Sequence, residues 1–96
     1  MAKKIKSVNE ISGRRLMGEN FTIIKNCIEP LCKNYVGFIR FKIFVEEMNH
    51  KMNFVLEFSK ETEIMNKLDG SVEDIESNIR FIMPPTILLN FYILYK

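Results

Sequence analysis

The sequence predicts a single α+β domain over residues 1–96, a ferredoxin-like βαββαβ two-layer sandwich with helices on one face of an antiparallel sheet. Two consecutive segments, 35–45 and 52–58, alternate apolar and polar residues, which is typical of a hairpin with one buried face. Segments with helical spacing lie on both sides of this hairpin, and a third alternating segment, 87–95, follows. Ninety-six residues allow one modest hydrophobic core and no second lobe.

The first 19 residues form a basic segment that is rich in loop signals. Residues 4–8 alternate weakly and are expected to form the first strand, whereas residues 9–20 hold two glycines without a clear period and are expected to form a loop. The basic side chains of this segment are Lys3, Lys4, Lys6, Arg14 and Arg15. Acidic side chains gather instead in the third quarter of the sequence. This asymmetry either orients the domain on a partner, with Arg14 and Arg15 as contacts, or reflects solvated helix faces.

A first helix is expected to begin at Asn20 or Thr22, either of which can cap a helix. The apolar residues that recur at helical spacing are Phe21, Ile24, Ile28 and Leu31. Pro30 is expected to end or kink this helix, because proline donates no backbone hydrogen bond and its ring clashes with the preceding turn.

The hairpin has an apolar face and a polar face on its first arm. Its expected core residues are Tyr35, Ile39, Phe41, Ile43 and Val45, and the residues expected on the other face are Arg40, Lys42 and Glu46. Residues 46–51 turn the chain. The second arm buries Met52, Phe54, Leu56 and Phe58.

The rest of the chain is expected to form helices and a last strand. Ser59 caps a short helix that Gly70 closes, and Ser71 with Asp74 begins another helix. Two successive prolines, Pro84 and Pro85, end that helix before the strand at residues 87–95.

Catalytic and metal-binding motifs are incomplete. Gly13 and Gly18 have phosphate-loop spacing, but Glu19 follows where a lysine is required. His50 has no orienting carboxylate at strand or helix spacing, and no second histidine joins Cys27 and Cys32 in a zinc pattern. We therefore expect no catalytic residue, metal or cofactor, and a protein that is not an enzyme.

Two features indicate where the protein resides. The uncharged segment 81–95 is shorter than a spanning helix and contains two prolines, so no membrane anchor is expected. The two cysteines are expected to be reduced and buried, which favours the cytoplasm.

The segment "GFIRF" at residues 37–41 resembles the second half of the base-stacking motif of RNA-recognition domains. It lies on the second expected strand, whereas in those domains the motif lies on the third. Phe38 beside Arg40 and Lys42 nevertheless leaves binding of RNA or single-stranded DNA as an alternative, because aromatic rings stack on bases while cations neutralise phosphates.

A second resemblance covers residues 8–68. Gly13-Arg14, Asn20-Phe21, Ile28-Glu29 and Glu57 follow one another in an order that is similar to the small C-terminal lid of adenylate-forming ligases of the phenylacetate-CoA ligase type. The resemblance implies a detached, accessory lid. The late lysine loop of such lids has no counterpart here except Lys96, so the resemblance implies no adenylating activity for the chain alone.

The leading hypothesis is a non-catalytic interaction module that acts through an open sheet face. Apolar residues are expected on the face opposite the hairpin core, and such faces are usually covered. They are Val36, Phe38 and Phe44 on the first arm, with Leu88, Tyr92 and Leu94 on the last strand. We expect the partner to be a second copy of the chain or another protein. The candidate contact residues are Arg14, Arg15, Phe38, Arg40, Lys42, Phe44 and Tyr92.

Overall fold

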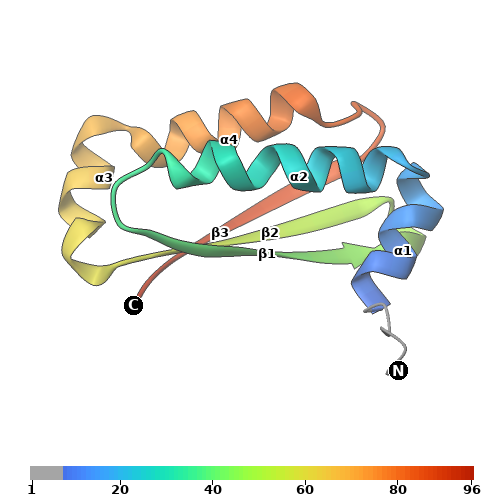
Figure 1. Ribbon diagram of the computed structural model, residues 1–96, viewed down its shortest axis with the longest axis horizontal. Coiled ribbons are helices and arrows are strands. Elements are labelled where there is room, and N and C mark those ends of the chain that lie inside the picture. The colour runs from blue at the N-terminus through green and yellow to red at the C-terminus, as the bar shows by residue number, and fades with distance from the viewer. Residues whose placement is uncertain (1–7) are drawn as a thin grey trace, which may run out of the picture.

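The structure, a computed structural model, describes residues 8–96 (Figure 1). Its helices and strands are α1 (Val8–Met17), α2 (Asn20–Lys33), β1 (Phe38–Glu46), β2 (Lys51–Phe58), α3 (Glu63–Asp69), α4 (Ser71–Ile82) and β3 (Leu88–Tyr95). Short 3₁₀ turns at Glu47–Asn49 and Lys60–Thr62 complete the connections. The α+β class is thus confirmed for the described residues.

The sheet has three strands in the order β1-β2-β3, and α2 and α4 lie side by side on one of its faces (Figure 1). β1 and β2 form the expected antiparallel hairpin, but β3 is parallel to β2. The prediction of an antiparallel sheet is therefore wrong for these strands. α4 carries the chain back along the sheet, so that β3 starts at the same end as β2, as in a βαβ unit.

The expected βαββαβ order differs from the described order at its start, where two helices precede β1. The first predicted strand, residues 4–8, lies outside the described residues except for Val8, which begins α1. Residues 9–17 are helical instead of forming a loop. A Cβ atom at Gly13 would lie 2.2 Å from the ring of Phe21. The glycine therefore lets α1 pack closely against α2. This contact between two helices stabilises α1, and no local period of apolar residues predicts it.

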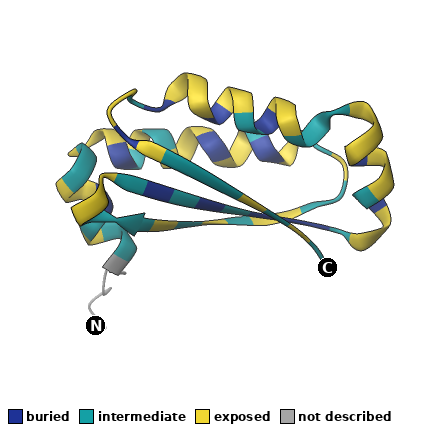
Figure 2. Ribbon diagram, turned by 180° about the vertical axis from the view of Figure 1, so that it is seen from behind, coloured by how far each residue is buried: buried dark blue, intermediate teal, exposed yellow. Residues whose placement is uncertain are grey.

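The core lies between the central strand and the two long helices (Figure 2). Alternate residues of β2 are fully buried, as the alternation predicts, and they meet buried residues of α2 and α4. The core side chains from these elements are Phe21, Ile28, Cys32, Met52, Phe54, Leu56, Phe58, Ile75 and Ile79. No residue of β3 is buried, although its helix-facing residues pack against the core.

Of the helix ends predicted from proline and glycine, one is wrong and two are confirmed. α2 continues through Pro30 to Lys33, so the prediction that Pro30 ends this helix is wrong. The ring of Pro30 is exposed, and proline costs the helix the one backbone hydrogen bond that this residue would donate. The buried Ile28 and Cys32 hold the helix on the core. Gly70 closes α3 with a left-handed φ of 73°, and α4 ends before the two prolines, as predicted.

Candidate functional site

The face of the sheet opposite α2 and α4 carries a regular array of side chains. Directly opposite residues in neighbouring strands share a face, so the strand register defines its rows. The rows are Arg40, Glu57 and Leu94; Lys42, Val55 and Tyr92; Phe44, Asn53 and Asn90; and Glu46, Lys51 and Leu88. Charged side chains are confined to β1 and β2. The β3 column is uncharged.

Glu57 is the centre of a charge cluster on this open face. Its side chain is only 1% exposed, and three cations surround it. Arg40 Nε lies 3.0 Å and Lys42 Nζ 3.6 Å from Glu57 Oε2, and Lys96 Nζ lies 2.9 Å from Oε1. One carboxylate therefore balances three positive side chains, and the cluster keeps a positive excess.

The cations around Glu57 also determine its protonation. Hydrogen bonds from Lys96 and Arg40 lower the pKa of Glu57 from 4.5 to about 2, against a smaller opposing effect of desolvation. The carboxylate thus stays ionised at any ordinary pH. A permanently charged, saturated carboxylate is suited to hold β1, β2 and Lys96 together, and it is unsuited to accept a proton in catalysis.

β3 carries the apolar part of the open face. Leu88, Tyr92 and Leu94 are 64%, 50% and 42% exposed, and they lie beside half-buried Val55 of β2. On the helix side of the same strand, the guanidinium of Arg80 lies 4.9 Å from the ring centre of Phe91.

β3 is also an edge strand with unpaired backbone groups. The N–H of Leu88 donates to His50 O (2.8 Å) and that of Lys96 to Phe58 O (2.9 Å), so the even-numbered residues bond to β2. The N–H and C=O groups of Leu89, Phe91 and Ile93 therefore point away from the sheet. Within residues 8–96, no backbone partner covers them.

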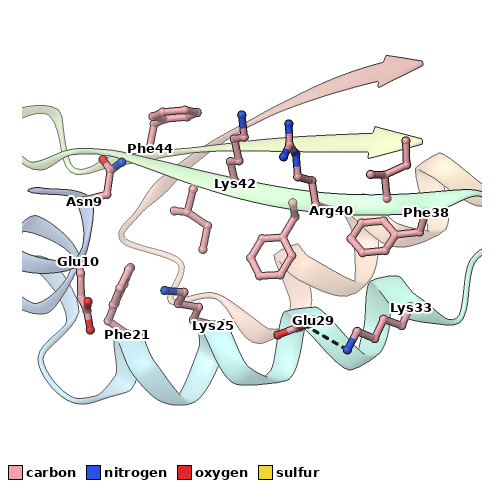
Figure 3. A pocket seen from close by; sticks show the side chains of 13 residues that line it. Asn9, Glu10, Phe21, Lys25, Glu29, Lys33, Phe38, Arg40, Lys42 and Phe44 are labelled. Atoms are coloured by element: carbon pink, nitrogen blue, oxygen red, sulfur yellow. Dashed lines mark ion pairs between the residues drawn. The ribbon is translucent and has the colours of Figure 1, made fainter. Parts of the chain in front are cut away.

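The predicted contact residues of β1 separate into two groups (Figure 3). Arg40, Lys42 and Phe44 lie on the open face, as expected, whereas Phe38 points towards α2. A bulge between Phe38 and Arg40 shifts the alternation by one residue. Phe38 packs edge to face on Phe58, with ring centres 5.8 Å apart, and it cannot stack on a base at the open face.

Two other predicted placements on or beside β1 are wrong. Ile39, an expected core residue, is 50% exposed, and Val36 lies in the turn before β1 instead of on the open face. The N-terminal cations do not join the sheet face: Arg14 pairs with Glu10 in α1 at 3.7 Å, and Arg15 with Glu47 at 3.5 Å. Of the predicted contacts, Arg40, Lys42, Phe44 and Tyr92 are brought together.

In the part of the chain that the structure describes, no group of three or more His, Cys, Asp or Glu side chains has a geometry that could hold a metal ion. The described helices are all too short or too polar to cross a membrane.

The two cysteines lie in different environments, which corrects the prediction that both are buried. Cys27 is exposed, whereas Cys32 lies in the core and its burial raises the pKa of the thiol to about 11. We expect a thiol reagent such as dithionitrobenzoate to label one cysteine of the native protein at neutral pH, and the second only after denaturation. Mass spectrometry of the labelled peptides tests this. Equal labelling rates at both positions would contradict the burial of Cys32.

Sequence reasoning missed two features of this face. Glu57 was not among the predicted contacts, although it stands as the single acid of 52–58 opposite the cations of 40–42. The position of β3 at an edge of the sheet depends on the strand order, and no local sequence pattern predicts the strand order.

The chain matches no protein-family model, and no curated protein or solved structure is significantly similar to it. The resemblance to a ligase lid therefore stays a prediction. In the structure, Gly13 and Arg14 lie inside α1, where Gly13 packs on Phe21.

Proposed function

We propose that the protein is a small non-catalytic interaction module that forms a homodimer through β3. The observation that carries this proposal is the uncharged, exposed and unpaired edge of that strand. Edge strands of soluble proteins usually carry charged residues, prolines or bulges that prevent pairing with another chain. The sequence of β3, LLNFYILY, contains none of these.

A two-fold axis beside β3 would join two copies into one six-stranded sheet. The outward backbone groups of Leu89, Phe91 and Ile93 would then bond to the same groups of the second copy in an antiparallel ladder. The exposed Leu88, Tyr92 and Leu94 would meet their counterparts on the open face and lose their contact with water. Of the cations around Glu57, Arg40 and Lys42 lie on β1, away from this axis, and Lys96 follows the last residue of β3.

Charge introduction into β3 tests the dimer. We expect the wild-type protein to sediment as a dimer at micromolar concentration, and the double variant Leu88→Lys/Tyr92→Lys to sediment as a monomer with an unchanged circular dichroism spectrum. In a ladder centred on Phe91, residue 88 lies opposite Leu94 and residue 92 opposite Asn90, with residue 92 of the second copy diagonally beside it. Lysines there would place charges in the surface that dimerisation buries and would bring the two lysines at position 92 near each other. In the wild type, the amides of Phe91 and Ile93 should exchange with deuterium more slowly as the concentration rises.

The matched control is Ile64→Lys/Leu68→Lys on α3. These two side chains are even more exposed than the β3 residues, so the same chemical change is made away from the sheet. The control variant should remain dimeric. A wild type that is monomeric at high concentration, or two double variants with equal association, would refute the proposed dimer.

Binding of single-stranded nucleic acid is a second candidate, and Phe44 beside Arg40 and Lys42 on the open face favours it. Against it, Glu57 already neutralises part of the charge of these cations, and Phe38 faces the core. Salt-sensitive binding of a short oligonucleotide that Phe44→Ala weakens at least several-fold would support this candidate. Binding that Phe44→Ala leaves unchanged would exclude base stacking at this face.

A further inference from the structure

The opposite edge of the sheet, along β1, has open backbone groups of its own. The backbone N–H of Val45 donates to Asn9 Oδ1 of α1 at 3.1 Å, which shows that this N–H points away from β2. Because alternate residues of a strand point the same way, the N–H and C=O groups of Phe41 and Ile43 also face outwards. Among the described residues they have no backbone partner. Asn9 closes one end of this edge and leaves the rest free.

A cavity of about 630 Å³ runs beside this free edge, between β1 and the first two helices (Figure 3). Its apolar surface comes from one residue of α2 and five of β1, namely Phe21, Phe38, Ile39, Phe41, Ile43 and Phe44. Lys25, Glu29 and Lys33 succeed one another at intervals of four residues on α2, so they share one helix face and form the opposite wall. A strand edge, an apolar floor and a helix wall are the elements of a groove that accepts an extended peptide.

The charges around the groove indicate the chemistry of its occupant. Four cationic side chains line it, namely Lys25, Lys33, Arg40 and Lys42. Against them stand the carboxylates of Glu10 and Glu29, and the buried carboxylate of Glu57, which Arg40 and Lys42 share. The first two carboxylates have cations of their own, because Glu10 pairs with Arg14 and Glu29 with Lys33. Lys25 has no ion-pair partner within residues 8–96. The groove therefore has a positive excess that an acidic segment would neutralise.

We propose that this groove binds an extended acidic peptide segment of another protein, which adds to the sheet as a strand beside β1. The peptide backbone bonds to the outward groups of Phe41 and Ile43. Its side chains alternate between the two faces of the extended sheet, so that acidic residues point towards Lys25 and Lys33 of α2 while apolar residues lie on the open face beside Phe44. This inference is independent of the proposed dimer, which uses the other edge of the sheet.

Two other occupants fit the groove less well. A second copy paired through β1 would bring the exposed cations Arg40 and Lys42 of both copies close together, and such like-charge contacts destabilise a ladder. Single-stranded nucleic acid would need several rings that lie open for stacking, whereas Phe38 and Phe41 pack against the core and Phe44 is the one exposed ring among the described residues that line the groove.

Fluorescence anisotropy with synthetic peptides tests the proposal. The probe is a labelled, acetylated peptide of about seven residues in which glutamate and valine alternate, a length that spans the free part of β1 at about 3.3 Å per residue. We expect saturable binding to the full chain in the micromolar range. Lys25→Glu/Lys33→Glu should weaken it by about tenfold or more, because the wall then repels the acidic side chains. Methylation of alternate backbone nitrogens of the peptide should abolish binding, since it blocks strand pairing.

The controls separate this site from non-specific attraction. Lys60→Glu/Lys67→Glu reverses two exposed charges outside the groove and should leave the affinity unchanged. Leu88→Lys/Tyr92→Lys, the variant that tests the dimer, should bind the peptide as the wild type does. The proposal fails if the peptide does not bind, if the methylated peptide binds equally well, if both lysine pairs have equal effects, or if an oligonucleotide binds the groove more tightly than the peptide.

Discussion

Replacing Gly37 with alanine is expected to lower the free energy of unfolding by about 2–5 kcal/mol. Gly37 has a φ of +79°, a left-handed conformation that costs other residues about 1–2 kcal/mol. The added Cβ would also lie 2.3 Å from Cγ2 and 2.7 Å from Oγ1 of Thr62. Overpacking of this kind typically costs about 1–3 kcal/mol.

Thr62 cannot move aside easily. It is almost fully buried, and its hydroxyl donates to Ser59 O at 2.7 Å and accepts from Asn66 Nδ2 at 3.4 Å. The N–H of Ser59 in turn donates to Gly37 O at 2.7 Å. The turn before β1 is thus held against the end of β2 by contacts that an alanine would displace.

Urea unfolding of two glycine variants separates the backbone cost from the steric cost. Gly18 has a similar φ of +65°, but no atom lies within 4 Å of the position of its Cβ, so Gly18→Ala should cost only about 1–2 kcal/mol. The double variant Gly37→Ala/Thr62→Ala should lose less stability than the sum of its single changes. Equal losses in Gly18→Ala and Gly37→Ala would show that the contact with Thr62 contributes nothing.

A second large loss of folding stability is expected on acidification. The folded protein lowers the pKa of Glu57 from 4.5 to about 2, so the unfolded chain binds a proton at this carboxylate at a higher pH than the folded one. The stabilisation is therefore complete above about pH 4.5 and is lost as the pH falls towards 2. The melting temperature should decrease steeply across that range.

Glu57→Gln isolates this contribution from other acidic groups, such as Glu46 and Asp69, whose pKa values hydrogen bonds also lower. The variant should melt several degrees below the wild type at pH 7, because three cations then surround a neutral amide. The difference should shrink as the pH falls to 2. Glu63→Gln, which removes an exposed pair with Lys67 at 2.8 Å, is the control and should have little effect at any pH. Parallel pH profiles for wild type and Glu57→Gln would contradict the role given to the cluster.

Local patterns were sufficient for the β1–β2 hairpin, for the start of α2, for α4, and for the position of β3 in the sequence. Alternation over residues 41–45 and 52–58 predicts which side chains are buried, because successive residues of a strand point to opposite faces. The same rule placed Arg40, Lys42, Phe44 and Tyr92 on the open face, where the structure has them. Phe38 escaped the rule because one extra residue in a bulge reverses the alternation before Arg40.

The α+β class, the hairpin and the apolar β3 could thus be predicted from local patterns, since each depends on the period of residues close in the chain. Local patterns could not predict that residues 9–17 are helical, that β3 lies parallel to β2 and leaves both sheet edges open, or that Glu57 is enclosed by three cations. These features depend on contacts between separate elements, such as Gly13 of α1 with Phe21 of α2, or Glu57 of β2 with Lys96 after β3. Such contacts leave no periodic pattern, because they form only when helices and strands pack together.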